Sequence, residues 1–269
     1  MSQPLQHQAR KRFGQNFLVD EGVVRQIVSA IRIHADQHII EIGPGKGALT
    51  SQLVDHCQRL DIIELDRDLI PFLHMQFQRH AHVHIHEADA LKFDFSNIIN
   101  SNSQAHVVGN LPYNISTPLI FHLLSYKQAF ASMHFMLQKE VVERLAAACG
   151  QKAYGRLSVM AQYFCEVDNL FEVAPHSFSP APKVTSAIVR LLPRQAPLIT
   201  ADNENHFADI VRIAFQQRRK TLRNALKDIL ADIDHNVLNI DLSLRAERLS
   251  VSDFVTLSNQ ILQLTPQAQ

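Results

Sequence analysis

Short apolar runs alternate with amphipathic segments along much of this chain, and this alternation constrains the fold more than any other feature. Most of the runs are near-continuous, which is typical of strands that are covered on both faces. They are His38–Ile42, Leu60–Leu65, Val83–Glu87, His106–Gly109 and Met133–Leu137. Helical spacing of apolar residues is found around them, at Glu21–Ile31, Ala48–His56 and Glu140–Ala148. The pattern predicts βαβ units and a doubly wound parallel sheet, an α/β fold.

The pattern changes after this region. Two extended segments, Val167–Ala174 and Val184–Leu192, are joined by the proline-rich loop Pro175–Pro182. Adjacent extended segments with a short connection favour antiparallel pairing. We therefore expect an antiparallel hairpin at the edge of the sheet.

The last part of the chain has only helical patterns. A linker with two prolines and few apolar residues runs from Pro193 to Asp202. Three segments beyond it have apolar residues at helical spacing, and Ser252 is the expected N-cap of the last one. They are Phe207–Phe215, Lys220–Leu230 and Asp253–Leu264. The sequence predicts an α/β domain over residues 1–196 and a small all-helical domain over residues 197–269.

Charge and composition limit the possible partners. The 26 lysines and arginines balance the 26 aspartates and glutamates, so contact with nucleic acid needs a local cluster of positive charge. The start of the chain lacks the apolar stretch of a signal peptide, and no run approaches transmembrane length. Three widely spaced cysteines are typical of reduced thiols. We expect a cytoplasmic protein without membrane contact.

A glycine-rich loop, Glu41–Gly47, follows the first predicted strand and opens a helix. Glycine allows the backbone to turn tightly and to approach a ligand without a Cβ clash. The spacing from Gly43 through Gly45 to Ala48 satisfies the relaxed dinucleotide fingerprint. On this motif alone, a dehydrogenase, a methyltransferase and a tight turn without any ligand all stay open.

Carboxylates follow the next two predicted strands. Glu64 ends the second strand, where an acid can accept both hydroxyls of a ribose. Asp89 follows the third strand and can accept from the amino group of an adenine, although a turn-forming aspartate fits its spacing equally well. Together with Gly43, these residues describe a ligand that contains adenosine.

The stretch Asn110-Leu111-Pro112-Tyr113 follows a fourth strand. An amide oxygen and a nearby backbone carbonyl can accept hydrogen bonds from an aromatic amine and aim its lone pair at an electrophilic methyl group. Positioning and stabilisation of developing positive charge would then raise the rate. The ring of Tyr113 can stack on the base, although a core aromatic is its alternative role. This turn favours an amino-group methyltransferase over a hydride-transfer enzyme.

Five motifs, in order, carry a resemblance over nearly the whole chain. They are Arg12–Leu18, Glu41–Gly47, Asn110–Ser116, Phe178–Val184 and Arg218–Asn224. With them the chain resembles the ribosomal RNA adenine dimethyltransferase family, and within it the small-subunit (16S) enzymes that form N6,N6-dimethyladenosine. The resemblance implies a Rossmann-like methyltransferase sheet and S-adenosyl-L-methionine as methyl donor.

The resemblance also implies roles for single residues. Asn16 and Leu18 would close over the cofactor, Gly43 would approach its methionine part, Glu64 its ribose and Asp89 its adenine. Asn110 would face both the methyl group and the target amine, and Phe178 would pack on a flipped adenine opposite Tyr113. The implied substrate is a pair of adjacent adenosines in a hairpin loop near the 3′ end of 16S rRNA, within a small ribosomal subunit precursor.

Two further sets of side chains are candidates for binding. Arg218, Arg219, Lys220 and Arg223 suggest a phosphate-binding helix face, with an ordinary solvated face as the alternative, and the resemblance favours RNA. Arg10–Arg12 is a second basic candidate. His80, His82, His84 and His86 alternate, but no cysteine or carboxylate set completes a metal site, so we expect no metal.

Other functions stay open at this point. A large-subunit (23S) rRNA adenine methylase that confers antibiotic resistance shares the glycine loop and the type of turn at Asn110. A mainly non-catalytic ribosome assembly factor and a nicotinamide-dependent oxidoreductase are further alternatives. Nothing in the sequence demands a dimer, and we expect a monomer.

Overall fold

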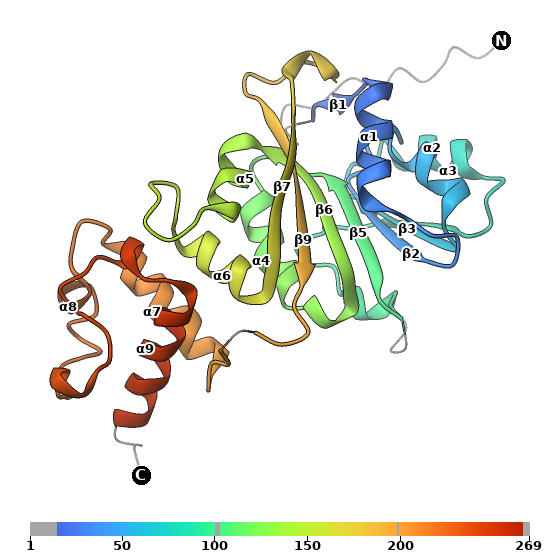
Figure 1. Cartoon of the computed structure of the whole chain (residues 1–269). Coiled ribbons are helices and arrows are strands. Elements are labelled where there is room, and N and C mark those ends of the chain that lie inside the picture. Colours follow the sequence, from blue (N-terminus) through green and yellow to red (C-terminus); the bar gives the residue numbers. More distant parts are fainter. Residues whose placement is uncertain (1–14, 100–102, 198, 266–269) are drawn as a thin grey trace. The chain divides into compact units, whose positions relative to one another are not determined.

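A central mixed sheet is the frame of the first part of the protein. The computed structural model describes residues 15–99, 103–197 and 199–265. Within these residues the sheet has seven strands in the order β4-β3-β2-β5-β6-β9-β7 (Figure 1). They are β2 (His38–Ile42), β3 (Arg59–Glu64), β4 (Val83–Glu87), β5 (Ala105–Asn110), β6 (Phe130–Gln138), β7 (Cys165–Val173) and β9 (Ser186–Pro193). A small second sheet pairs β1 (Phe17–Leu18) antiparallel with β8 (Phe178–Ser179).

Strands β4, β3, β2, β5 and β6 are parallel, as the sequence predicted. Strand β9 is antiparallel to β6, and β7 lies beyond β9 at the edge, so the two extended segments expected to be neighbours at the edge are neighbours. In the sheet, β3 lies on one side of β2 and β5 lies on the other, so the order of the strands reverses at β2. This reversal beside β2 is the place where open α/β sheets hold their ligands.

The helices of this part agree with the sequence in one case and differ in others. Helix α1 (Glu21–Ile31) has the predicted bounds, and Asp20 caps it by accepting from the amides of Gly22 and Val23. Helix α2 is only Thr50–Leu53, followed by a 3-10 turn, because the glycine-rich turn continues through Leu49. Helices α3 (Ile70–Phe77) and α4 (Ser116–Leu124) cover further connections between strands. Helix α3 carries its own apolar residues on most of its sides, so its sequence has no clear helical spacing of apolar positions.

An apolar core packs around the strands nearest the site. It joins residues of α1, such as Val24 and Ile27, to β2 and β3, and it extends to Phe17, Leu18 and Phe178 of the small sheet. Burial of such side chains contributes about 25 cal/mol per Å² of apolar surface. The small sheet is therefore anchored in the same core as the strands that carry the site.

Several of the histidines hold a buried carboxylate in this sheet. Asp61 of β3 is 0% exposed and lies 2.6 Å from Nε2 of both His38 and His86, and 2.7 Å from Nε of Arg59. Burial raises the pKa of Asp61, but the hydrogen bonds from His38, His86 and Arg59 outweigh it and hold that pKa well below its usual range. The two histidines complete a polar network of the sheet, and the alternating pattern that includes His86 did not indicate this role in the sequence.

Contacts divide the chain into two compact units. The first is Met1–Val142 with Asp168–Pro193, and the second is Glu143–Val167 with Arg194–Gln269. The end of the first unit at Pro193 lies close to the expected boundary at residue 196. The segment Glu143–Val167, which the sequence places in the middle of the first domain, groups with the second unit.

The remaining helices of the described residues belong wholly or in part to the second unit. Helix α5 (Lys139–Ala146) enters it, and α6 (Arg156–Phe164), α7 (Glu204–Gln216) and α9 (Val251–Leu264) pack within it. Ser250, rather than Ser252, is the N-cap of α9, because Ser250 and Asp253 form a reciprocal capping box.

The helix predicted over Lys220–Leu230 is the largest error. Only α8 (Leu222–Ala225) is helical there. The amides of Leu222 and Arg223, which lie in the first turn and have no partner within the helix, donate to the carbonyls of Leu244 and Leu242 of a neighbouring segment. Leu226 and Leu230 are nevertheless buried, at 1% exposure each, which explains their helix-like spacing.

None of the helices in the described ranges has the length and apolar composition that a bilayer crossing requires.

Candidate functional site

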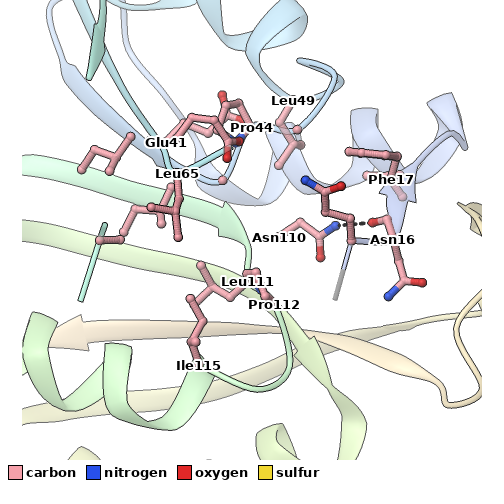
Figure 2. Close-up of a pocket in the computed structure, with 18 of the residues that line it drawn as sticks. Asn16, Phe17, Glu41, Pro44, Leu49, Leu65, Asn110, Leu111, Pro112 and Ile115 are labelled. Carbon is pink, nitrogen blue, oxygen red and sulfur yellow. Dashed lines mark hydrogen bonds between the residues drawn. The ribbon is translucent and has the colours of Figure 1, made fainter. Parts of the chain in front are cut away.

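A cavity of about 360 Å³ lies in the first unit, at the carboxyl ends of the parallel strands. Because β2, β3 and β5 are parallel neighbours, the residues that follow them meet at one edge of the sheet. Figure 2 shows the cavity with Asn110 and Asn16 on one side and Glu41 and Leu65 on the other. Seven of the residues expected from the sequence line it: Asn16, Leu18, Gly43, Glu64, Asp89, Asn110 and Tyr113.

The glycine loop brings the backbone close to this cavity. Gly43 and Gly45 have φ angles of 67° and 59°, in the left-handed region that favours glycine. The amide of Gly43 donates to the carbonyl of Ile63 at 2.9 Å, which ties the loop to the end of β3. A Cβ at Gly45 would lie 2.9 Å from Cδ1 of Phe17, so a side chain at that position meets the N-terminal segment.

Residues 15–20, here called the N-terminal strap, are held across the cavity edge. Nε2 of Gln15 donates to Oδ2 of Asp66 at 2.8 Å, next to the end of β3. Phe17 and Leu18 pair with Ser179 and Phe178 in the small sheet. The hydroxyl of Ser177 donates to the carboxylate of Asp20 at 3.0 Å. The strap therefore connects the end of β3 to the proline-rich loop.

The amide of Asn110 has one orientation that satisfies its contact with the strap. Its Nδ2 donates to the backbone carbonyl of Asn16 at 2.9 Å (Figure 2). A carbonyl accepts only, so the amide nitrogen must face it. The amide oxygen then lies on the other branch of the planar group, where it can accept from a ligand. The contact with the strap therefore leaves Oδ1 of Asn110 as the atom that can accept a hydrogen bond from a ligand.

Tyr113 lines the cavity from the turn after β5. Its hydroxyl is 2.8 Å from Oγ of Ser186, at the start of β9. Burial raises the pKa of Tyr113, and the hydrogen bond to Ser186 opposes that rise. The phenol therefore stays neutral at ordinary pH and offers its ring as an apolar wall.

Two buried carboxyl groups line the cavity where β2 and β3 end. Glu41 is 1% exposed and accepts from Oγ1 of Thr50 at 2.6 Å. Its burial, opposed by that hydrogen bond and reinforced by the charge of Glu64, raises the pKa of Glu41 to about 7. Burial also raises the pKa of Glu64, against backbone amides that include those of Asp66 and Gly45.

Asp89 joins the same edge beyond β4. Its Oδ1 accepts from the amide of Leu91 at 3.0 Å, as in a turn-forming aspartate. It also lines the cavity, so the turn and the ligand-facing position both hold for this residue. Its expected contact with an adenine amino group stays a prediction.

Phe178 has a different environment from the one expected. It is 4% exposed, it pairs with Leu18, and it is absent from the described residues that line the cavity. A base could stack on its ring only after the side chains that bury the ring had moved aside. Its role as a second aromatic wall stays a prediction.

The basic residues lie in the second unit. Arg218, Arg219, Lys220 and Arg223 are exposed. A guanidinium nitrogen of Arg218 donates to the carbonyls of Lys152 and Tyr154, at 3.1 and 2.9 Å, so this arginine also ties two segments of that unit together. The other basic candidate, Arg10–Arg12, lies outside the described residues.

No group of three or more histidine, cysteine, aspartate or glutamate side chains in the described ranges could hold a metal ion. Two of the alternating histidines, His82 and His86, contact groups elsewhere in the first unit. Nε2 of His82, for example, lies 2.8 Å from the carbonyl of Val54.

The cavity fits an adenosine-containing cofactor. Its volume of about 360 Å³ lies within the usual range for small-molecule sites, roughly 300–1,000 Å³. The left-handed glycines admit a ligand close to the backbone, and the carboxyl groups of Glu64 and Asp89 supply acceptors at two separate strand ends. Apolar residues such as Leu65 and Ile115 complete the walls (Figure 2).

Sequence reasoning missed some residues of the site. Glu41 belongs to the glycine-loop motif but was assigned no role, although a carboxylate at the end of an apolar strand was a visible signal. Ser186 and Gln15 had no local signal, because their partners Tyr113 and Asp66 are 73 and 51 residues away.

Comparisons with known proteins agree on one family. Residues 6–263 match the family described as "Ribosomal RNA adenine dimethylase". A curated relative from Marinomonas sp. (strain MWYL1), "Ribosomal RNA small subunit methyltransferase A", is 57% identical over 262 residues, which are 97% of this chain and 98% of the relative.

Two solved structures have the same architecture. A dimethyladenosine transferase from Plasmodium falciparum matches with a TM-score of 0.74 at 27% identity, over 90% of this chain and 95% of the other. The 23S rRNA methyltransferase ErmE matches with a TM-score of 0.69 at 23% identity, over 92% of this chain and 100% of the other, a likeness of fold alone. These matches agree with the Rossmann-like methyltransferase sheet that the sequence predicted.

Proposed function

We propose, since the chain belongs to the ribosomal RNA adenine dimethylase family, that it dimethylates N6 of two adjacent adenosines in a hairpin loop near the 3′ end of 16S rRNA. The protein is an enzyme, and its methyl donor is S-adenosyl-L-methionine. The observation that carries the proposal is the amide of Asn110. Its nitrogen is taken by the carbonyl of Asn16, so its oxygen is left to accept from the target amine.

On the donor side, the chain's own residues account for binding and orientation. Gly43 admits the methionine part, Glu64 accepts from the ribose hydroxyls, and Asp89 accepts from the adenine amine. Asn16 and Leu18 of the strap cover the cofactor. When bound, S-adenosyl-L-methionine supplies an electrophilic methyl group on a positively charged sulfur.

On the acceptor side, the turn after β5 prepares the amine. An aromatic NH2 is a poor nucleophile because its lone pair is delocalised into the ring. Hydrogen bonds from the NH2 to Oδ1 of Asn110 and to a backbone carbonyl of the turn favour a pyramidal nitrogen and stabilise its developing positive charge. Tyr113 stacks on one face of the base, and Phe178 packs on the other face once the side chains that cover its ring move aside. No protein nucleophile is needed.

The target must be removed from its stack to reach this site. An adenine inside a helix hides N6, whereas loop bases are easily splayed out and read by stacking. Arg218, Arg219, Lys220 and Arg223 in the second unit supply phosphate contacts for the surrounding RNA.

The small-subunit substrate is favoured over a large-subunit one. The relative that is 57% identical is named a small subunit methyltransferase, whereas the 23S methyltransferase structure is 23% identical. We further propose a contribution to small-subunit biogenesis, and a monomer in the cytoplasm as the working form.

The decisive experiment uses 30S particles that lack the modification, together with unmodified 50S particles. The purified protein and S-adenosyl-L-methionine are added, and methylated adenosines are mapped by mass spectrometry. We expect N6,N6-dimethyladenosine at two adjacent positions of 16S rRNA and none in 23S rRNA. Methylation of 23S rRNA instead would overturn the assignment, and a rescue of assembly by a catalytically dead variant would add a binding role.

A further inference from the structure

The hydroxyl of Tyr113 is held by a residue that belongs to a different part of the sheet. Tyr113 reaches the cavity from the turn after β5, while its partner Ser186 begins β9, which follows the proline-rich loop. The two oxygens are 2.8 Å apart, a normal distance for a hydrogen bond between hydroxyls. The contact therefore joins the acceptor turn to the strand on the far side of β6.

Ser186 is a firm support for this contact. It is 0% exposed and pairs with Gln138 in the antiparallel register of β6 and β9. The carbonyl of the preceding residue, Thr185, accepts from the amide of Lys139 at 3.0 Å. The strand pairing fixes the backbone of the serine, and its complete burial limits the space that is open to its hydroxyl.

The ring of Tyr113 is thereby fixed at both ends. Its backbone lies in the turn, where its carbonyl accepts from Oγ of Ser116 at 3.2 Å. The para hydroxyl is fixed by Ser186. The para oxygen lies on the long axis of the ring, so a hydrogen bond to it restricts the first side-chain torsion and fixes the direction of that axis. Without the hydrogen bond to Ser186, the ring can tilt although it stays in the same part of the cavity wall.

We propose that Ser186 is a positioning residue, which acts through the Tyr113 hydroxyl to fix the wall against which the target adenine stacks. This inference rests on the proposed function, because it takes Tyr113 as that wall. Methyl transfer requires the amine nitrogen and the methyl group to be aligned at near-contact distance, and small misplacements reduce the rate steeply.

The second of the two methyl transfers depends most on this wall. After the first transfer the amine carries a methyl group and must be aligned again in a more crowded cavity. A base held between fixed walls keeps its alignment, whereas a base beside a tilting ring has more unproductive poses. Removal of the hydrogen bond should therefore slow the second transfer more than the first and release N6-monomethyladenosine.

The test compares Ser186→Ala, Tyr113→Phe and the double variant on 30S particles that lack the modification. Single-turnover rates of both transfers and the ratio of monomethyl- to dimethyladenosine are measured by mass spectrometry. We expect each single variant to slow the second transfer about tenfold, with a smaller effect on the first. The double variant should be no slower than either single one, because both changes remove the same hydrogen bond.

Matched controls separate positioning from general loss of structure. Tyr126→Phe removes a tyrosine hydroxyl that bonds to Asp94, away from the cavity, and Ser132→Ala removes a hydroxyl from a serine that is 4% exposed in β6. Both controls should retain the normal product ratio. Affinity for S-adenosylhomocysteine and the melting temperature are measured for every variant, and Tyr113→Phe, at a half-buried position, tests the hydrogen bond even if Ser186→Ala folds poorly.

A normal product ratio in Tyr113→Phe, or additive rate losses in the double variant, would overturn the role of Ser186. If the unaltered protein forms no dimethyladenosine on these particles, the proposed function itself fails and this inference fails with it. The two failures are distinct because the first requires an active unaltered enzyme.

Discussion

At the scale of single residues, Asn110 is a hydrogen-bonding group whose two ends have different tasks. Its nitrogen is satisfied by the carbonyl of Asn16, and under the proposed function its oxygen accepts from the target amine. Under the same proposal the strap helps to orient the target amine, in addition to its expected place over the cofactor. Loss of the side chain removes both tasks at once.

Asn110→Ala should lower the methyl-transfer rate by at least about two orders of magnitude, the usual effect of losing an oriented charge-stabilising group. The measurement is the single-turnover rate on 30S particles, with Asn97→Ala, an exposed amide outside the cavity, as the control. Near-normal turnover would remove Asn110 from the mechanism.

Glu41 is a second residue with a consequence of its own. The raised pKa of about 7 exceeds the ordinary value of 4.5, so the folded state holds the proton more tightly than the unfolded chain does. This stabilisation is fully present below about pH 4.5 and is lost as the pH rises through about 7. The free energy of unfolding that disappears is about 3 kcal/mol.

Glu41→Gln should remove that pH dependence, because the amide can still accept from Thr50 but cannot ionise. Urea unfolding at about pH 5 and about pH 8 gives the free energies of both proteins. The stability of the unaltered protein relative to the variant should fall by about 2.5 kcal/mol over this interval. A difference that does not change with pH would show that Glu41 titrates as an ordinary carboxyl group.

At the scale of elements, the glycine loop and the strap depend on each other. Phe17 of the strap occupies the space beside Gly45, and Nζ of Lys46 lies 5.0 Å from the centre of the Phe17 ring. Because Gly45 has no side chain, it can adopt the left-handed turn and also leaves space for Phe17 of the strap. A side chain at Gly45 would therefore also displace Phe17.

Gly45→Ala should therefore destabilise the fold and weaken cofactor binding. The left-handed conformation alone costs an alanine about 1–2 kcal/mol, and the Cβ also displaces Phe17. Calorimetric titration with S-adenosylhomocysteine and thermal melting provide the measurements. Gly155→Ala is the matched control, since its φ of −171° is extended and a Cβ there meets nothing within 4 Å. Equal behaviour of the two variants would contradict the interpretation.

At the scale of the whole molecule, the candidate site and the candidate RNA-binding residues lie in different units. The cavity lies in the first unit, and the basic residues Arg218–Lys220 lie in the second. The net charge of zero means that RNA binding must depend on local clusters. Arg218 also bonds to Lys152 and Tyr154, so its replacement would confuse folding with binding.

The exposed pair Arg219 and Lys220 gives a cleaner test. Arg219→Glu with Lys220→Glu should weaken binding to 30S particles and reduce its salt dependence, by a slope of roughly 0.7–0.9 for each phosphate that is no longer neutralised. The double variant Arg25→Glu with Arg79→Glu makes the same charge change at exposed positions of the first unit and is the control. An unchanged salt slope would return Arg219 and Lys220 to an ordinary solvated surface.

The sequence by itself determined the α/β architecture and the edge at which the site lies. The strands β2 and β4 and the helix α1 have the predicted bounds, because burial and period are local properties of a segment. Gly43, Glu64, Asp89 and Asn110 could be assigned to one edge because parallel strands bring their carboxyl ends together.

Only the tertiary structure decided which side chains meet across that edge. Asn16 and Asn110 are 94 residues apart, and Tyr113 and Ser186 are 73 apart, so their contacts depend on how distant strands pair. The burial of Phe178, which pairs with Leu18 of the strap, and the short helix after Thr221 likewise depend on segments far away in the chain. Local patterns report that a residue is buried, whereas register and packing between distant segments determine what it is buried against.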